Sequence, residues 1–187
     1  LWLIYFFGLP RPLFLYVLGH ELTHAFFVLL CGGKISEFKV KSGGGHIVTN
    51  KNNVLISLSP YFIPFYSVIL IALFGITGIF VDNLFEYHPN VLFWGKIGFS
   101  WSWILYMSVG ITWCFHLTFT SWMITKNQPD LKQNGTFFSL VFIYFINLMI
   151  LSITLILVSN EISLTGFVES LLDNGSKLIN QASRILR

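Results

Sequence analysis

Four long apolar segments, separated by short polar stretches, dominate the hydrophobic pattern of the chain. They cover residues 12–31, 54–81, 91–125 and 136–158. About 20 residues of α-helix span the roughly 30 Å hydrocarbon core of a bilayer, so each segment is long enough to cross one. Pro60 and Pro64 fall in the first half of the second segment and predict a break in its helix. The pattern therefore predicts an all-α polytopic membrane protein with about four membrane helices.

Residues 34–53, between the first two apolar segments, follow a different pattern. Ile35 and Val40 precede the turn sequence Ser42-Gly43-Gly44-Gly45, and Ile47 follows it. β-Branched residues on both sides of a glycine-rich turn are typical of a β-hairpin, here one associated with the membrane. Two interpretations stay open for this hairpin. It is either a surface loop between spans or an edge strand that binds an extended substrate by β-addition.

The C-terminal residues 160–187 form an amphipathic segment. Phe167, Leu171 and Leu178 recur near helical spacing, and Asn174-Gly175 predicts a break. A helix of this kind lies on a membrane surface or against a partner and does not cross the bilayer. We therefore divide the chain into a membrane-embedded core, 1–159, and an amphipathic tail, 160–187.

Composition and charge agree with a membrane protein. Of the 187 residues, 55% are hydrophobic and only 10% are charged, against about 25% charged in soluble domains. The net charge of +3 is small and dispersed, which excludes a nucleic-acid partner. The positive-inside rule predicts that the hairpin faces the cytoplasm, because most basic residues near the apolar segments fall on its side. These are Lys34, Lys39, Lys41, Lys51, Lys126 and Lys132, against Arg11 and Lys96 on the opposite side.

The strongest chemical signal is His20-Glu21-Leu22-Thr23-His24, in the middle of the first apolar segment. Ionisable groups in such surroundings cost several kcal/mol, a cost normally tolerated only for function. Residues four apart share one helix face, so His20 and His24 can bind one metal ion while Glu21 reaches a water on that metal. The alternative is a pair of core histidines bonded to polar neighbours, with Glu21 as their counter-ion.

A catalytic zinc site needs three protein ligands and one open position for water. Two residues compete for the third position. His116 lies at a depth in its apolar segment that matches His20 and His24, and Asp130 follows Gln128-Pro129 in a stretch that can fold back toward the metal. The third ligand therefore stays open between Asp130 and His116.

These features resemble the site-2-protease superfamily of intramembrane zinc metalloproteases, in particular its compact bacterial branch without a PDZ domain. The resemblance rests on the His-Glu-x-x-His sequence at 20–24, the hairpin ending Gly43-Gly44-Gly45-His46, Ser59-Pro60, His116-Leu117-Thr118, and Gln128-Pro129-Asp130. In that family the third ligand is an aspartate followed by glycine, whereas Leu131 follows Asp130 here.

The resemblance implies a zinc-dependent enzyme that hydrolyses a peptide bond within or next to a transmembrane segment. Glu21 would be the general base toward a zinc-activated water. Gly44, Gly45 and His46 are candidates for substrate binding at the hairpin, and Asn147 is another on the last apolar segment. Water must reach the metal, so we expect a polar cavity beside His24 that opens toward the hairpin.

The resemblance also implies a multi-pass protein of the bacterial inner membrane. Its partners would be a membrane-protein or transmembrane-peptide substrate, the lipid bilayer and other membrane subunits. Two alternatives remain. One is a non-catalytic scaffold or assembly subunit that retains the protease-like fold, and the other is a metal-dependent hydrolase of lipids or other non-peptide substrates.

Overall fold

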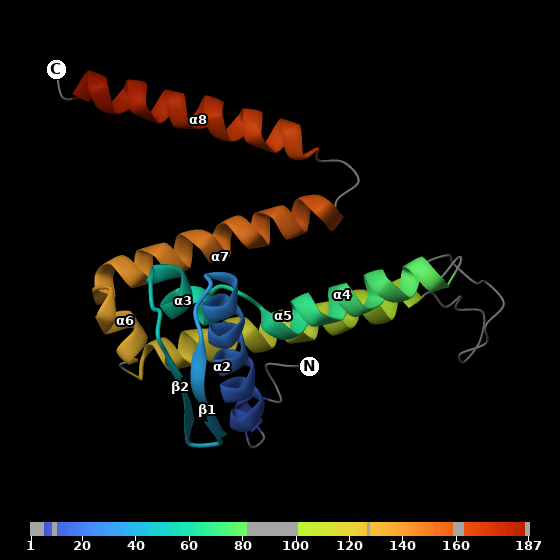
Figure 1. The fold of residues 1–187 in the computed structure, drawn as a ribbon. Coiled ribbons are helices and arrows are strands. Elements are labelled where there is room, and N and C mark those ends of the chain that lie inside the picture. The colour runs from blue at the N-terminus through green and yellow to red at the C-terminus, as the bar shows by residue number, and fades with distance from the viewer. Residues whose placement is uncertain (1–5, 9–10, 82–100, 127, 159–162, 186–187) are drawn as a thin grey trace. The chain divides into compact units, whose positions relative to one another are not determined.

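The computed structural model describes residues 6–8, 11–81, 101–126, 128–158 and 163–185. Within these ranges the chain is helical apart from one two-stranded antiparallel sheet, as predicted (Figure 1). It divides into two compact units, Leu1–Ile143 and Tyr144–Arg187, which are described separately. The predicted domain boundary at 159–160 falls outside the described residues and stays a prediction.

Helix α2 (Leu13–Leu30) contains the His-Glu-x-x-His sequence and agrees closely with the predicted helix. It begins directly after Pro12, and proline is well suited to the start of a helix. It ends where Gly32 takes a positive φ of 73° and the Gly33 amide donates to the Val28 carbonyl at 2.8 Å. A glycine in this conformation is a common helix terminator.

The predicted hairpin is present as strands β1 (Ile35–Lys41) and β2 (Gly44–Thr49). Ser42 and Gly43 form the two-residue connection, and Lys41 pairs with Gly44. One face of β2 packs on α2 at Gly45, where an added Cβ would lie 2.6 Å from Cγ of Glu21 and 2.8 Å from the Lys39 carbonyl oxygen. Only glycine allows the hairpin to approach α2 this closely.

The second apolar segment is broken as its prolines predict. It consists of α3 (Val54–Leu58), the short 3-10 helix η1 (Ser59–Tyr61) and α4 (Phe65–Phe80). The two parts meet at an angle of 82°. Asn53 caps α3 by accepting the Ile56 amide on its side-chain oxygen at 2.8 Å. The bend turns α3 and η1 toward α2 rather than continuing the direction of α4 (Figure 1).

The later helices are α5 (Trp101–Ile124), α6 (Pro129–Gln133) and α7 (Thr136–Val158). Among the described residues, only Leu13–Leu30 and Thr136–Ile156 are long and apolar enough to cross a membrane as single helices, and the bent pair makes a third if it counts as one span. The prediction was about four. α5 does not qualify, because its tryptophans, serines, threonines and His116 lower its mean hydropathy.

The charge count behind the predicted orientation of the hairpin changes at Arg11, and the orientation itself stays a prediction. The guanidinium of Arg11 lies 4.7 Å from the ring centroid of Trp122, and the Lys126 ammonium lies 5.2 Å from the same ring. The prediction had separated Arg11 and Lys126 by the membrane. Packing instead brings the start of α2 beside the end of α5, so the two residues cannot be counted on opposite sides.

Helix α8 (Leu164–Ile185) is continuous, and the predicted break at Asn174-Gly175 is wrong. A glycine inside a helix costs only about 1 kcal/mol, and the ion pair between Asp173 and Lys177 at 2.6 Å spans this position. Val168, Leu172 and Ile179 are exposed on its apolar side, in agreement with an amphipathic helix.

Helix α2 is enclosed by protein on several sides. Its Tyr16 ring stacks on Phe119 of α5 with centroids 4.9 Å apart, and its Val28 packs with Ile56 of α3. Glu21 and Thr23 on the same helix are 6% and 2% exposed. The polar side chains of α2 therefore face the protein interior.

Candidate metal centre

His20 and His24 lie one turn apart on α2 and point their rings to the same place. Their Nε2 atoms are 3.2 Å apart, and their side chains are only 11% and 13% exposed. This is the result that four-residue spacing on a helix predicts.

Asp130 of α6 completes a group of three ligand atoms. Its Oδ2 lies 3.5 Å from Nε2 of His20 and 3.6 Å from Nε2 of His24. Zinc bonds nitrogen and oxygen at about 2.0–2.2 Å, so two ligands of a tetrahedral site lie roughly 3.3–3.5 Å apart. The triangle of His20, His24 and Asp130 therefore has the size that three zinc ligands require, and a fourth position remains for water.

Hydrogen bonds on the far side of each imidazole orient the rings. Nδ1 of His24 lies 2.7 Å from the carbonyl oxygen of Ile56. A carbonyl only accepts, so Nδ1 of His24 carries a proton and its Nε2 is the nitrogen that faces Asp130. Nδ1 of His20 lies 3.4 Å from the Tyr16 hydroxyl. Partners of this kind fix the tautomer of metal-binding histidines.

Asp130 is held from the side of η1. The Tyr61 hydroxyl donates a hydrogen bond to Oδ2 of Asp130 at 3.0 Å. Two further hydrogen bonds anchor the α6 helix that carries Asp130. Asn134 donates to the Ser57 hydroxyl at 2.6 Å, and the Ser139 hydroxyl donates to the Leu131 carbonyl at 3.0 Å.

The electrostatics of Asp130 favour a charged ligand. Burial alone would raise the pKa of its carboxyl group. The two imidazoles beside it outweigh this effect and hold the pKa of Asp130 well below its usual range. The carboxylate is therefore ionised at neutral pH, which is the form that binds a cation.

A cavity of about 330 Å³ opens beside the triangle toward the hairpin, where the sequence predicted one. It is lined by residues of α2, β2 and α6, among them His24, Glu21, Gly44, Gly45, His46 and Asp130. Glu21 therefore lines the same cavity as the three candidate ligands. The side chain of His46 is 56% exposed and its Nε2 lies 3.7 Å from Oε1 of Glu37.

The structure does not bring the other predicted site residues into the triangle. His116 is 7% exposed and lines a second, much smaller cavity together with Gly19, His20 and Thr23. Among the described residues, the group of side chains able to share a metal contains Asp130 and not His116. Asn147 lies in the second compact unit, so its predicted role in substrate binding stays a prediction.

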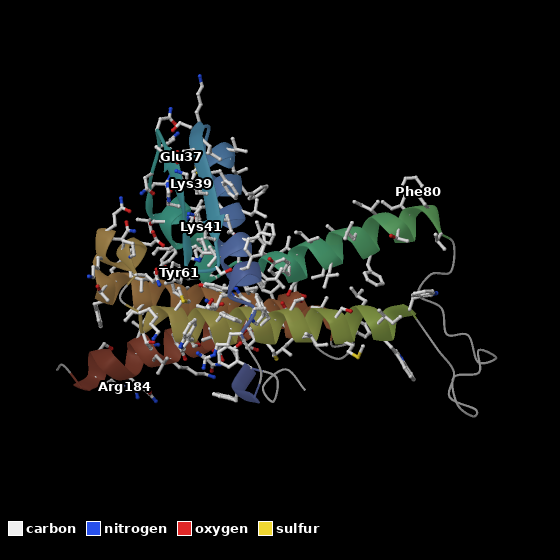
Figure 2. The ribbon with its side chains drawn as sticks, turned by 90° about the horizontal axis from the view of Figure 1, so that it is seen from below. Glu37, Lys39, Lys41, Tyr61, Phe80 and Arg184 are labelled. Atoms are coloured by element: carbon white, nitrogen blue, oxygen red, sulfur yellow. The ribbon has the colours of Figure 1, made fainter. Side chains whose placement is uncertain are left out.

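Sequence reasoning missed Tyr61 and Tyr16 as partners of the candidate ligands. Tyr61 is fully buried, and its ring meets the ring of His20 edge-on at 5.2 Å. Figure 2 shows Tyr61 among the densely packed side chains where the hairpin and helices meet, whereas Phe80 lies at the far end of α4. The available signal was a tyrosine in an apolar segment, since a buried tyrosine hydroxyl usually needs a polar partner.

Comparison of the chain with protein-family models, curated proteins and solved structures finds no match. Its function therefore has to be inferred from the geometry of the site itself.

Proposed function

We propose that the chain is a membrane-embedded zinc metallopeptidase, with His20, His24 and Asp130 as zinc ligands and Glu21 as general base. The observation that carries this proposal is the triangle of ligand atoms, with sides of 3.2, 3.5 and 3.6 Å. These atoms come from two helices far apart in the sequence, and each is oriented by a further hydrogen bond.

The distances favour a metal site over a histidine–aspartate ion pair. An imidazolium that donates to a carboxylate makes a short hydrogen bond of about 2.7–2.9 Å. The two distances to Asp130 are 3.5 and 3.6 Å, too long for such a bond and close to the separation of two ligands on one zinc ion.

Each residue has a distinct role in the proposed reaction. A bound zinc ion would make water nucleophilic at neutral pH and polarise the carbonyl of the scissile bond. Glu21 takes the proton from the attacking water and returns it to the leaving nitrogen. Because β2 lines the cavity, its backbone at Gly44 and Gly45 can hold an extended peptide beside Glu21, with His46 at the same edge.

The setting of the site supports a substrate within or next to a transmembrane segment. The ligand helix α2 is itself long and apolar enough to cross a membrane, as is Thr136–Ile156. A substrate chain in or at the bilayer would lie next to this ligand helix. The proposed protein is a multi-pass protein of the bacterial inner membrane, and its partners are lipid and other membrane subunits.

Replacing Glu21 tests the proposal most directly. Purified full-length protein, its Glu21→Gln variant and a control Glu169→Gln variant are reconstituted in liposomes with a panel of single-span peptides. Glu169 is an exposed carboxylate on α8, so its loss removes charge without touching the site. We expect equal zinc content in all three proteins and cleavage by the wild type and Glu169→Gln only.

Other outcomes identify the alternatives. Cleavage by Glu21→Gln at the wild-type rate would exclude Glu21 as the base. Stoichiometric zinc without cleavage of any peptide would favour the scaffold subunit, and release of fatty acid from the liposomes would favour a lipid hydrolase. Absence of zinc from the wild type would overturn the metal site.

A further inference from the structure

Tyr61 makes a contact that the zinc ligands and the general base leave unexplained. It is fully buried, and its hydroxyl donates to Oδ2 of Asp130, the same oxygen that faces His20 and His24. A carboxylate oxygen has two in-plane lone pairs. The hydroxyl of Tyr61 occupies one of them and leaves the other directed at the two imidazoles.

The rest of α6 gives Asp130 little other support. The helix has five residues, Pro129–Gln133, and its remaining anchors act on the backbone or on other side chains. Asn134 bonds Ser57, and Asn52 donates to Gln133 at 2.9 Å. These contacts fix where α6 lies, whereas the hydrogen bond from Tyr61 acts on the carboxylate itself.

We propose that Tyr61 is a positioning residue that fixes the rotamer of Asp130 and presents Oδ2 as a single ligand atom. The proposal depends on the metal site proposed above. Tyr61 also packs its ring edge against His20, so one buried side chain braces ligands from both helices. Because the ligands stay in place without the ion, less conformational entropy is lost when the metal binds.

The test compares zinc affinity in metal-stripped full-length protein and its variants, by competition with a chromophoric chelator. Tyr61→Phe removes only the hydroxyl and keeps the ring in the core. Tyr66→Phe is the matched control, because the Tyr66 hydroxyl donates to the Leu15 carbonyl at 2.6 Å and not to a candidate ligand. We expect Tyr61→Phe to bind zinc roughly 10–100-fold more weakly, the usual effect of losing a partner of a metal ligand, and Tyr66→Phe to match the wild type.

Two further measurements separate positioning from a general effect on the fold. The absorption spectrum of the Co²⁺-loaded protein reports the ligand field, and we expect it to change in Tyr61→Phe but not in Tyr66→Phe. In an Asp130→Ala background, Tyr61→Phe should cause no further loss of zinc affinity. The rise in melting temperature on adding zinc, referred to each variant's own metal-free form, remains informative if Tyr61→Phe is less stable.

The outcomes distinguish the two proposals. Equal zinc affinity and equal cobalt spectra for Tyr61→Phe and the wild type would overturn the role of Tyr61 and leave the metal site standing. An equal loss of affinity in the Asp130→Ala background would also overturn it. Failure of the wild type to bind zinc would overturn both proposals.

Discussion

Asp130 connects the candidate metal centre to the rest of the chain. The two histidines belong to one helix, and their spacing alone brings their Nε2 atoms within 3.2 Å of each other. The third ligand atom comes from α6, and its position depends on contacts with α3, η1 and α7. This difference explains why spacing predicted His20, Glu21 and His24 clearly but left Asp130 and His116 open. The depth of a residue along its helix does not determine which neighbouring helix its side chain faces.

Replacing the two competing residues separates their roles. We expect Asp130→Asn to weaken zinc binding by more than about 100-fold, since losing only an outer partner of a ligand costs about 10–100-fold. The variant keeps the shape of the side chain and an acceptor for Tyr61. His116→Gln should leave zinc affinity within about twofold, because His116 is not in the group of side chains that can share a metal. Chelator competition on both purified variants measures these affinities, and the reverse ranking would make His116 the ligand.

Zinc affinity should also depend on pH in a defined direction. The pKa of Asp130 is held below its usual range, because the two neighbouring imidazoles outweigh its burial. This carboxylate therefore stays ionised through the neutral and mildly acidic range. Protons compete with zinc at His20 and His24, so affinity should fall as the pH drops, by up to roughly 100-fold per pH unit once both imidazoles bind protons. Chelator competition from pH 7.5 to 5.5 tests this, and a flat profile would exclude two histidine ligands.

At the scale of elements, the hairpin and the broken second segment position the site. Glycines and β-branched residues predicted the hairpin, and Pro60 and Pro64 predicted the break, because both signals act on the local backbone. The 82° bend that brings Tyr61 to Asp130 was not predictable, since a proline breaks a helix without setting the new direction. The error in α8 is of a different kind. Asn174-Gly175 is only a weak local signal for a break, and the helix continues through it.

Gly45 sets the distance between the hairpin and α2. An added Cβ would lie 2.6 Å from Cγ of Glu21 and 2.8 Å from the Lys39 carbonyl. We expect Gly45→Ala to destabilise the fold by about 1–3 kcal/mol, the usual cost of overpacking, and to reduce cleavage by displacing Glu21 or β2. Gly43→Ala is the control, because no atom lies within 4 Å of its added Cβ, and it should change stability by less than about 0.5 kcal/mol.

Thermal unfolding and peptide cleavage measure both effects of these glycine substitutions. Figure 2 places Glu37, Lys39 and Lys41 along the β1 strand, and Lys39 pairs with Glu37. Substitutions at these exposed positions are expected to leave the packing on α2 unchanged. Wild-type stability and activity in Gly45→Ala would show that the hairpin does not need to lie against Glu21.

At the scale of the whole molecule, apolar length predicted the helices better than it predicted the membrane crossings. The last apolar segment forms α7 with the predicted bounds, 136–158. The described part of the third segment forms α5, which is 24 residues long but not apolar enough to be a candidate span. The orientation of the hairpin stays a prediction, although its charge count placed Arg11 and Lys126 on opposite sides and packing brings both residues to Trp122.

A bound zinc ion would join α2 to α6 and so stabilise the first compact unit, which contains both helices. Free zinc at about 1,000 times its dissociation constant adds about 4 kcal/mol to the free energy of unfolding. For a chain of this size that corresponds to a rise in melting temperature of roughly 8–16 °C. We therefore expect a chelator to lower the melting temperature of the detergent-solubilised protein by this amount, and zinc, but not magnesium, to restore it. Asp130→Asn should melt at nearly the same temperature with and without chelator. A wild-type melting temperature that does not respond to the chelator would mean that no metal joins these two helices.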